Sequence, residues 1–566
     1  MRPPRALLAI AAGAAALTAA GAAHAAPAPR IQVGGPSSPS EPKVAIVGGP
    51  RSLKGDRFKV RDATGRVVLR GRLRRAPGTP APWDHAYRAD LSRVTEPGRY
   101  RVRVGKLTSR PWTVTDGAES AGIDAILAYF RANRDGTEPS PIHGPAHLND
   151  AVIHPDSPVL PGQAIDMTGG WMDAGDMLHF TQTTAFATAL LEAAARLAPS
   201  DAPALTTEAD VGLRWLLKAH PAPGVFVAQV GDERDHDLGF RDPADDDMSA
   251  DPGIGIRFAY PEIGGDLGGK AATALALGYI RTGDSQYLAA AEDWYAAGLD
   301  AARPARPLKR AGYPAYAANF YAAPNWKDSM ASAAVELYRA SCLAGACDGA
   351  YSDQFRDILS DSKQTGPYAA MGAVDDFASF GEAEACGAFG PAPEVTEDMR
   401  TLGCRLLKQN GAIASRQAAS NAFGMPGYFS WGTTAQNGAA GALAALSTAA
   451  PGAPAAKACR TAAGARDYLL GRNPYGASFV VGYGPRAPEH PHHWGSVFGK
   501  GIPAGAVVGG PAPRGEIRSQ GFPVRGKLGT SFATYEDRRA DYVTSEPAID
   551  YSAPSILLLA ALRAHC

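Results

Sequence analysis

The chain has 566 residues, of which 56 are basic and 56 are acidic, so its formal net charge at pH 7 is zero. A chain of this length exceeds what one hydrophobic core organises, and we expect more than one domain. The charge balance, with no block of basic residues, argues against nucleic acid or an anionic membrane surface as a partner.

The first 25 residues predict a secretory signal peptide. Arg2 and Arg5 precede an Ala-rich apolar run over 6–23, and Ala23-His24-Ala25 matches a small-residue cleavage pattern. The alternative is a membrane anchor, but the run holds few large apolar residues and no second long apolar run follows. We therefore expect a secreted protein without a membrane partner.

Six cysteines lie in the second part of the chain. In an exported protein an even number of cysteines favours disulfide bonds. Several pairings are open, and sequence order favours Cys342–Cys347, Cys386–Cys404 and Cys459–Cys566. A metal site is the alternative, but none of the spacings is Cys-x-x-Cys.

Alternating apolar and polar residues predict short β-strands in the N-terminal part, over 44–47, 57–60, 67–69, 99–104 and 112–114. Turn residues separate these segments, as in Ala63-Thr64-Gly65. Short strands at this spacing are typical of a small β-sandwich, which we place at 31–115.

Beyond Asp116 the apolar residues take helical spacing, in Ala-rich runs around 186–197, 271–279, 333–340, 438–446 and 554–562. Long loops rich in Gly, Pro, Asp and aromatic residues connect these runs. Loops of this length inside a compact domain usually carry function. We therefore expect a large all-α domain over 121–566 with its site in the loops.

The segment Gly-Gly-Trp-Met-Asp-Ala-Gly-Asp at 169–176 places Asp173 and Asp176 on one tight turn. Two carboxylates held this close repel each other, which raises the proton affinity of one of them and suits a general base beside water. The alternative is a helix N-cap, in which Asp accepts hydrogen bonds from free backbone amides.

A second acidic segment spans 535–553 and contains Glu546 among aromatic and apolar residues. Such surroundings keep a carboxylic acid protonated near neutral pH, as a general acid requires. The alternative is a salt bridge between Glu546 and Arg538 or Arg539.

Three histidines, His490, His492 and His493, lie in a Gly/Pro-rich loop that ends in Trp494. Such a cluster binds zinc, donates hydrogen bonds to sugar hydroxyls or simply lies on the surface. Because no His-Glu-x-x-His helix accompanies it, a zinc hydrolase is the weaker interpretation.

Together these segments resemble glycoside hydrolase family 9, in particular its subgroup with an N-terminal immunoglobulin-like domain, over nearly the whole chain that follows the signal peptide. The matching stretches are 147–150, 230–236, 325–328, 431–432, 470–474, 535–542 and 546–548. The resemblance implies an all-α (α/α)6 barrel with an open cleft, which cleaves β-1,4-linked glucan with inversion and needs no cofactor.

The resemblance also implies the roles of individual residues. Asp176 would activate water as the base, Asp173 would hold that water or support the base, and Glu546 would donate a proton to the leaving oxygen. The substrate-binding residues would be His236, His492, Trp494 and Tyr542. In an inverting enzyme the two carboxyl groups should lie ~6.5–9.5 Å apart.

The sequence departs from the family at Trp494, where an Arg is usual, at Ser552, where an Asn is usual, and at Leu238-Gly239-Phe240, which replaces a Trp pair. The acid and base are kept while the sugar-binding positions change, so we expect an altered substrate preference. Mixed-linkage glucan, xyloglucan and a chitosan-like oligosaccharide are alternative substrates. A non-catalytic carbohydrate-binding protein on the same barrel is the alternative from another class.

A structural calcium ion is a further implication of the resemblance. Asp328 with Asp375 or Asp376 would supply its carboxylate ligands, although Ser329 stands where the family often has an acid. We expect a monomer that binds its polysaccharide or oligosaccharide substrate and has no other partner.

Overall fold

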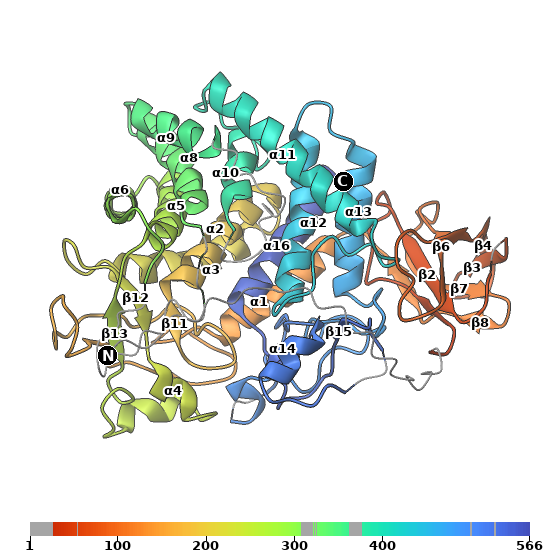
Figure 1. Cartoon of the computed structure of the whole chain (residues 1–566), viewed down its shortest axis with the longest axis horizontal. Helices are drawn as coiled ribbons and strands as arrows, with labels where there is room; N and C mark the ends of the chain where they lie inside the picture. Colours follow the sequence, from red (N-terminus) through yellow and green to blue (C-terminus); the bar gives the residue numbers. More distant parts are fainter. Residues whose placement is uncertain are drawn as a thin grey trace, which may run out of the picture.

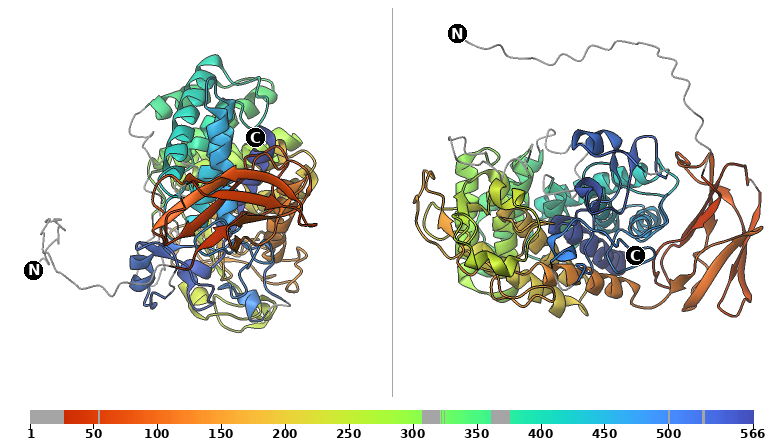
Figure 2. Two further views of the ribbon diagram at one scale, coloured as in Figure 1. Left: turned by 90° about the vertical axis from the view of Figure 1, so that its right-hand side faces the viewer. Right: turned by 90° about the horizontal axis from the view of Figure 1, so that it is seen from below.

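The protein divides into a β-rich domain at one end of its long axis and a mostly helical body that forms the rest (Figures 1 and 2). The computed structural model describes residues 27–53, 55–306, 321, 323, 325–360, 376–498, 501–525 and 528–566. The predicted signal peptide lies outside these residues. No helix in the described ranges is long and apolar enough to cross a membrane.

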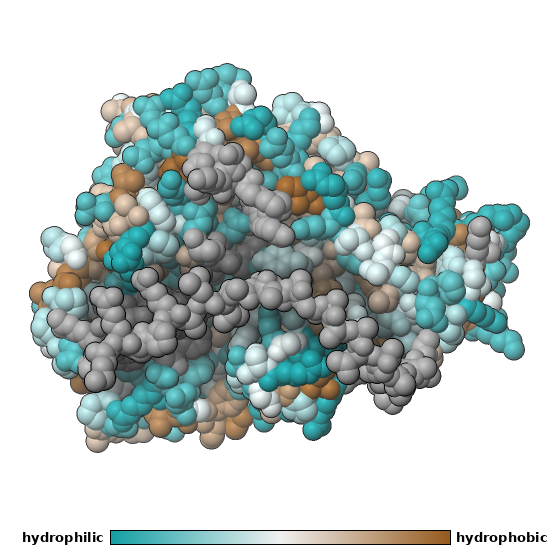
Figure 3. Space-filling view, viewed as in Figure 1, coloured by the Kyte–Doolittle hydropathy of each residue, from teal (hydrophilic) through white to brown (hydrophobic). Residues whose placement is uncertain are grey.

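The β-rich domain consists of two antiparallel sheets, with strand orders β1-β2-β6-β5 and β4-β3-β7-β8, and β9 pairs with β7. Their strands are β1 (Arg30–Gln32), β2 (Val44–Gly49), β3 (Arg57–Arg61), β4 (Val67–Arg72), β5 (Arg74–Arg75), β6 (His85–Asp90), β7 (Gly98–Val104), β8 (Leu107–Thr108) and β9 (Trp112–Val114). Alternate residues of β7 are buried, and Val60 and Val102 pair in the core. The face seen in Figure 3 is largely hydrophilic on this domain.

The five predicted strands are confirmed as β2, β3, β4, β7 and β9. Strand β6 was not predicted; it pairs with β2 from Val44↔Asp90 to Gly49↔His85. The polar residues Arg88 and Asp90 obscure its apolar pattern, because their neighbours Tyr87 and Ala89 face the core.

The helical body holds both long helices and short loop elements. The helices are α1 (Ala118–Ala132), α2 (Thr181–Leu197), α3 (Ala202–Lys218), α4 (Glu233–Asp237), α5 (Gly265–Thr282), α6 (Ser285–Ala301), α8 (Lys327–Leu343), α9 (Gly349–Ser360), α10 (Ala378–Ala385), α11 (Glu397–Ala418), α12 (Thr433–Leu446), α13 (Ala455–Leu469), α14 (Arg514–Ser519), α15 (Tyr542–Ser545) and α16 (Ile549–His565). The short strands are β10 (Val152–Ile153), β11 (His179–Phe180), β12 (Val227–Val230), β13 (Phe258–Pro261), β14 (Ala512–Pro513) and β15 (Ala533–Thr534).

The helices fall into an inner and an outer set. α2, α5, α8, α10, α12 and α16 bury nearly all of their residues, whereas α6, α9, α11 and α13 leave polar residues exposed. Small residues let the inner helices approach closely, because a Cβ at Gly269 would lie only 2.4 Å from the backbone of Ser329. All five predicted Ala-rich helical runs belong to the inner set.

The loops that hold the two acidic segments, 169–176 and 535–553, gather at one end of the helices. The elements β11, β12, β13, α4, α14 and β15 lie at the same end (Figure 1). A four-stranded sheet of order β10-β13-β12-β11 lies among them. Because β11 leads directly into α2, this sheet fixes the loop that precedes α2.

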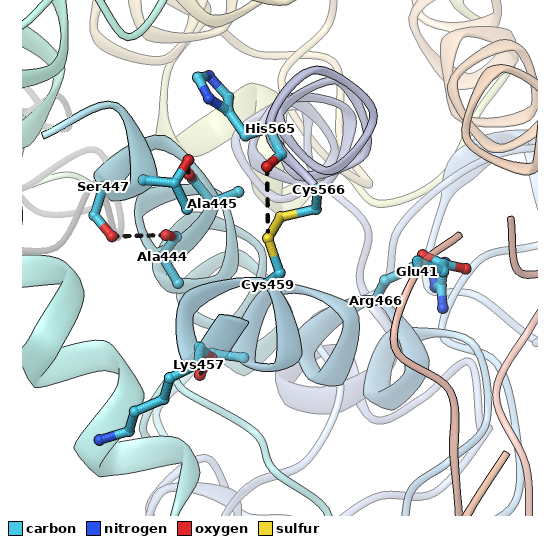
Figure 4. Close-up of a disulfide and its surroundings, with 11 residues drawn as sticks. Glu41, Ala444, Ala445, Ser447, Lys457, Cys459, Arg466, His565 and Cys566 are labelled. Carbon is cyan, nitrogen blue, oxygen red and sulfur yellow. Dashed lines mark hydrogen bonds and ion pairs between the residues drawn. A yellow bond between two sulfur atoms is a disulfide. The ribbon is translucent and has the colours of Figure 1, made fainter. Parts of the chain in front are cut away.

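A buried ion pair joins the two domains. Arg466 on α13 donates to both carboxylate oxygens of Glu41 at 2.5 Å and to Asp467 at 2.7 Å (Figure 4). Gly34 passes so close to Asp467 that a Cβ there would lie 2.3 Å from its carboxylate. Removing one partner of such a buried pair leaves an uncompensated charge, so the β-rich domain is firmly attached to the helical body.

The predicted disulfide pairing is confirmed, and all six cysteines are bonded. Cys459–Cys566 links α13 to the end of the chain after α16 (Figure 4). Cys386–Cys404 links the end of α10 to α11. Cys342–Cys347 closes a short loop after α8.

Candidate active site

The two aspartates of segment 169–176 lie in a loop that ends before α2, and they do not cap that helix. The N-cap of α2 is Phe180, which makes no side-chain capping bond. The loop instead folds on itself, because the amide of Asp173 donates to the carbonyl of Leu178 at 2.9 Å and the amide of Leu178 donates to Asp176 at 3.3 Å. The helix-cap interpretation is therefore wrong.

Backbone hydrogen bonds tie this loop to the histidine loop and to the Glu546 segment. The amide of Trp494 donates to the carbonyl of Gly175 at 3.0 Å, and the amide of Ile549 donates to the carbonyl of Asp173 at 2.9 Å. A Cβ at Gly175 would lie 2.2 Å from the carbonyl oxygen of His492 and 3.0 Å from Glu546 Oε1. Glycine is therefore required where the three segments meet.

Asp176 forms an ion pair with His236 of α4. Asp176 Oδ2 lies 2.7 Å from His236 Nδ1, and both side chains keep part of their surface exposed. The hydrogen bond to Asp176 raises the pKa of His236 to about 9, against the opposing effect of burial. At neutral pH the protonated imidazole therefore lies against the Asp176 carboxylate, the charged form that a general base needs.

Asp173 differs from its neighbour because it is buried. Its Oδ2 accepts a hydrogen bond from the Tyr321 hydroxyl, while its buried Oδ1 has no partner among the described residues. Burial raises the pKa of Asp173 to about 7, and the negative charge of Asp176 adds to the rise. Asp173 is thus the acid of the pair whose proton affinity rises, and the main cause is burial rather than the predicted repulsion by Asp176.

Glu546 is the third carboxyl group of the cluster. Its Oε1 accepts a hydrogen bond from the amide of Gly175 at 3.3 Å. Burial raises the pKa of Glu546 to about 8, and the charges of Asp176 and Asp173 add to the rise, while His236 lowers it. Glu546 therefore holds a proton at neutral pH, as a general acid must.

The predicted alternative for Glu546, a salt bridge, is wrong in the part of the chain that the structure describes. Arg538 pairs with Glu536 at 3.5 Å, and Arg539 donates to the carbonyl of Ser496 at 3.1 Å. Neither guanidinium group neutralises the Glu546 carboxyl, so its proton is not displaced by an arginine.

Aromatic side chains extend from the acidic cluster. The His492 ring lies 4.7 Å from Phe240 and 5.6 Å from Tyr542, and Tyr542 stacks with the half-exposed Trp431 at 5.6 Å. His236 also belongs to this cluster, through Asp176. The structure thus places His236, His492 and Tyr542 together, as predicted, and adds Trp431, whose exposed ring offers a stacking face.

Trp494 does not belong to this surface. Its side chain is fully buried and packs with Ile142, Met172 and Met177 beneath the loop. The prediction that Trp494 binds substrate is therefore wrong in this structure. A Gly/Pro-rich loop suggests exposed side chains, but the burial of Trp494 is decided by its packing against residues distant in the sequence.

The other histidines of the loop have separate partners, which argues against a zinc site. His490 lies 3.4 Å from Asp537, and the Nε2–H of buried His493 donates to Asn133 Oδ1 at 3.0 Å at the end of α1. His492 lies 2.7 Å from the carbonyl of Arg539. Within the described ranges no three His, Cys, Asp or Glu side chains group as metal ligands.

The predicted calcium ligands receive no support from the described residues. Asp328 is buried, accepts from the amide of Phe377 at 2.7 Å and lies in the field of the buried Lys270 ammonium. A cation already present beside the carboxylate opposes binding of a second cation. Asp375 lies outside the described residues, so the calcium site stays a prediction.

A buried charge network supports the aspartate loop from below. Arg257 donates to the carbonyl of Met177 at 2.5 Å and pairs with Asp150 at 2.5 Å and with Asp135 at 3.3 Å. His147 lies 2.7 Å from Asp135, and its pKa is raised to about 9. This network positions Met177, the residue that follows Asp176.

Sequence reasoning missed Tyr321, Asn133 and Arg257 as parts of the site. Asn133 donates to the carbonyl of Met172 at 3.0 Å and so holds the loop just before Asp173. None of these residues lies in a motif with recognisable spacing, and only the fold brings them to the loop.

Comparisons with known proteins agree with this arrangement. Residues 121–559 match the model of glycosyl hydrolase family 9, and residues 35–109 match that of the cellulase N-terminal ig-like domain. Endoglucanase 14 of Arabidopsis thaliana is 29% identical over 500 residues, which cover 77% of this chain and 91% of the relative. Endoglucanase B of Cellulomonas fimi is 29% identical over 486 residues, which cover 78% of this chain and 41% of the relative.

Solved structures show the same fold. A metagenome-derived glycoside hydrolase family 9 endoglucanase superimposes with a TM-score of 0.76 at 24% identity, over 95% of this chain and 99% of that one. A thermostable endoglucanase variant from Alicyclobacillus acidocaldarius gives a TM-score of 0.76 at 23% identity, over 94% and 99%. From the family match over most of the chain, this protein belongs to glycosyl hydrolase family 9 and is a glycoside hydrolase.

Proposed function

We propose that this protein is a secreted endo-β-1,4-glucanase that cleaves with inversion, with Asp176 as general base and Glu546 as general acid. One observation carries the proposal. Glu546, with a pKa raised to about 8, accepts a hydrogen bond from Gly175, the residue that precedes the ion-paired Asp176. A protonated acid and a charged base thus share one site, as the reaction requires.

The proton transfers follow from these states. Asp176 takes a proton from water as the water oxygen attacks the anomeric carbon, and Glu546 gives its proton to the glycosidic oxygen as that bond breaks. Asp173, whose Oδ2 is held by Tyr321, supports the base or the water from its place beside Asp176. A carboxyl separation of ~6.5–9.5 Å is expected for this mechanism.

The aromatic surface supports a linear sugar polymer as substrate. Trp431 and Tyr542 stack with each other beside His492, and rings of this kind bind the apolar faces of sugars. Several relatives carry the name endoglucanase, and AaCel9A, a solved structure of the same fold, is in complex with cellobiose-like isofagomine. We infer that a β-1,4-glucan lies along this surface.

We further propose that the helical body, starting near residue 121, is an (α/α)6 barrel. Contacts between α2 and α5, α5 and α8, α8 and α10, α12 and α16, and α16 and α2 support an inner ring. We propose secretion on the basis of the predicted signal peptide and the three disulfides, which persist in oxidising compartments. Independence of a cofactor and a monomeric state are also proposals.

The test is a panel of soluble cellulose derivatives, mixed-linkage glucan, xyloglucan and chitosan oligosaccharides, with release of reducing ends as the readout. We expect the highest kcat/KM on the β-1,4-glucan. A preference for another polymer would overturn the substrate assignment and keep the hydrolase. Binding of oligosaccharides without turnover of any of them would favour the non-catalytic alternative.

A further inference from the structure

A cavity of about 250 Å³ lies between the β-rich domain and the helical body, away from the carboxyl cluster. Val44 on β2 and Arg88 on β6 line one wall, and residues of α11 and α13 line the other. A water occupies about 30 Å³, so the cavity has room for several waters or for a small solute.

The charged side chains that line the cavity are all cationic. They are Arg88, Lys457, Arg460 and Arg472, and neither Asp nor Glu lines it. Arg472 pairs with Asp467 at 3.0 Å. The other three form no ion pair with any residue that the structure describes.

Arg88 is the most unusual of these groups. Its side chain is half-buried, and its Nε is shielded from solvent without a hydrogen-bond partner in the described structure. Burial lowers the pKa of Arg88 to about 10, and the positive charges of Arg472 and Arg460 lower it further. A guanidinium group that is partly desolvated beside like charges is costly unless an anion compensates it.

Arg88 faces an open point beside Gly424. A Cβ at Gly424 would lie 3.7 Å from Arg88 Nη2, and Gly424 has a φ of 71° and no side chain, so that point stays open. Arg472 Nη2 lies equally close to it but already donates to the carbonyls of Phe423 at 2.9 Å and Gly464 at 3.2 Å. The guanidinium group of Arg88 beside an open space matches the acceptor oxygens of a carboxylate, phosphate or sulfate, and the buried charge of Arg472 adds to the positive field.

The same interface shows how this protein pairs an arginine when no ligand is needed. Arg466, also on α13, is held by Glu41 and Asp467 of the protein itself (Figure 4). Lys457, labelled in the same figure, extends from α13 on the side away from the disulfide. The cavity therefore has an excess of positive charge that the protein does not neutralise.

We propose that this interdomain cavity is a binding site for a small oxyanion, which bridges Arg88 of the β-rich domain to Arg460 of the helical body. The oxyanion is the carboxylate of an acidic sugar or an inorganic phosphate or sulfate, because all three present the same acceptors to guanidinium groups. The proposal concerns binding alone and does not rest on the glucanase activity.

The test is calorimetric titration of the full-length protein with sodium sulfate, sodium phosphate and sodium glucuronate at constant ionic strength, which NaCl sets. The variants are Arg88→Gln and Arg460→Gln, and the matched control is Arg99→Gln, an exposed arginine on β7 in the other sheet. Arg460 is exposed, so its substitution leaves folding intact even if Arg88→Gln does not. Thermal unfolding with and without each anion is the second readout.

We expect saturable binding of one anion per chain to the wild type and to Arg99→Gln, and at least tenfold weaker binding to Arg88→Gln and Arg460→Gln. Without anion, Arg88→Gln should unfold at a higher temperature than the wild type, because it removes an uncompensated cation. Tightest binding of glucuronate among the three anions would identify an acidic sugar, and tightest binding of phosphate or sulfate an inorganic source. Equal responses of all four proteins, or none beyond that of NaCl, would overturn the proposal.

Discussion

Asp135 and Asp173 are both buried carboxyl groups in loops of the same helical body, yet their pKa values move in opposite directions. Burial raises both, but the charge of His147 and of Arg257 outweighs it at Asp135, whose pKa falls well below its usual range. At Asp173 the hydrogen bond from Tyr321 lowers the pKa but does not outweigh burial and the charge of Asp176, so the pKa rises to about 7.

The difference teaches how one fold builds a rigid support and a reactive site from the same residue types. Where cations match the buried acids, as around Arg257, the charges are satisfied and hold the loop. Where acids outnumber cations, as around Glu546, protons are retained for chemistry. Substitutions around Glu546 should therefore lower activity, whereas substitutions around Arg257 should lower the free energy of unfolding.

The largest effect is expected from Asp176→Asn and Glu546→Gln. Each removes one proton-transfer group, so kcat on a β-glucan should fall about 10²–10⁴-fold. Circular dichroism should match that of the wild type, because neither change alters a buried ion pair of the support network. Asp124→Asn, at an exposed acid on α1, is the control and should keep full activity. Retained activity in both site variants would show that the reaction uses other groups.

The support network should respond in stability. Arg257→Gln leaves Asp150 and Asp135 with less compensation, so the free energy of unfolding should fall by ~3–5 kcal/mol. Urea denaturation measures the loss, and Arg257→Lys is the milder variant if the first does not fold. Arg214→Gln, which breaks an exposed pair with Glu138, should cost only ~0–1 kcal/mol. Equal losses in the two positions would contradict the role given to Arg257.

Stability should also depend on pH through Glu546. Its pKa is about 8 in the folded protein against 4.5 for an unperturbed glutamate, so its contribution is present below about pH 4.5 and is lost as pH rises through 8. The midpoint temperature of Glu546→Gln should therefore match that of the wild type at pH 4 and exceed it at pH 9. A constant difference across this range would mean that Glu546 is not protonated in the folded state.

The alkaline limb of the pH–activity profile should also reflect the ionisation of Glu546. The wild-type kcat/KM should fall as pH rises through about 8, because ionised Glu546 has no proton to give. Glu546→Gln should lack this limb in its residual activity. An alkaline limb that is unchanged in the variant would assign it to another residue.

The smallest effect is expected on the aromatic surface. Trp431→Ala removes a half-exposed ring worth about 0.5–1.5 kcal/mol, so KM should rise roughly 3–10-fold while kcat changes little. Trp494→Phe is the matched control, because its buried ring should affect the unfolding temperature and leave KM unchanged. The reverse pattern would restore Trp494 as the substrate-binding residue.

Local patterns predicted the parts of the fold that bury most apolar surface. The Ala-rich inner helices α2, α5, α8, α12 and α16 show as apolar runs in the sequence. The outer helices α6, α9, α11 and α13 have polar exposed faces and were not predicted, and neither was the polar strand β6. Amphipathic helices are harder to separate from loops when their polar side is broad.

At the site, the sequence predicted the three carboxyl groups and the neighbours His236, His492 and Tyr542, because each lies in a segment with recognisable spacing. It did not predict Tyr321 at Asp173 or Arg257 beneath Met177, since these contacts join residues 148 and 80 positions apart. Trp494 was misassigned for the same reason, because its burial depends on Ile142 and Met172.

The most direct test of the central claim is NMR of the first products released from a soluble β-1,4-glucan by the wild-type protein. Inversion with Asp176 as base and Glu546 as acid predicts that the α-anomer appears first and converts to the equilibrium mixture later. Asp176→Asn should release no product on this timescale. Initial appearance of the β-anomer would contradict the mechanism and require a covalent intermediate on one of the carboxylates.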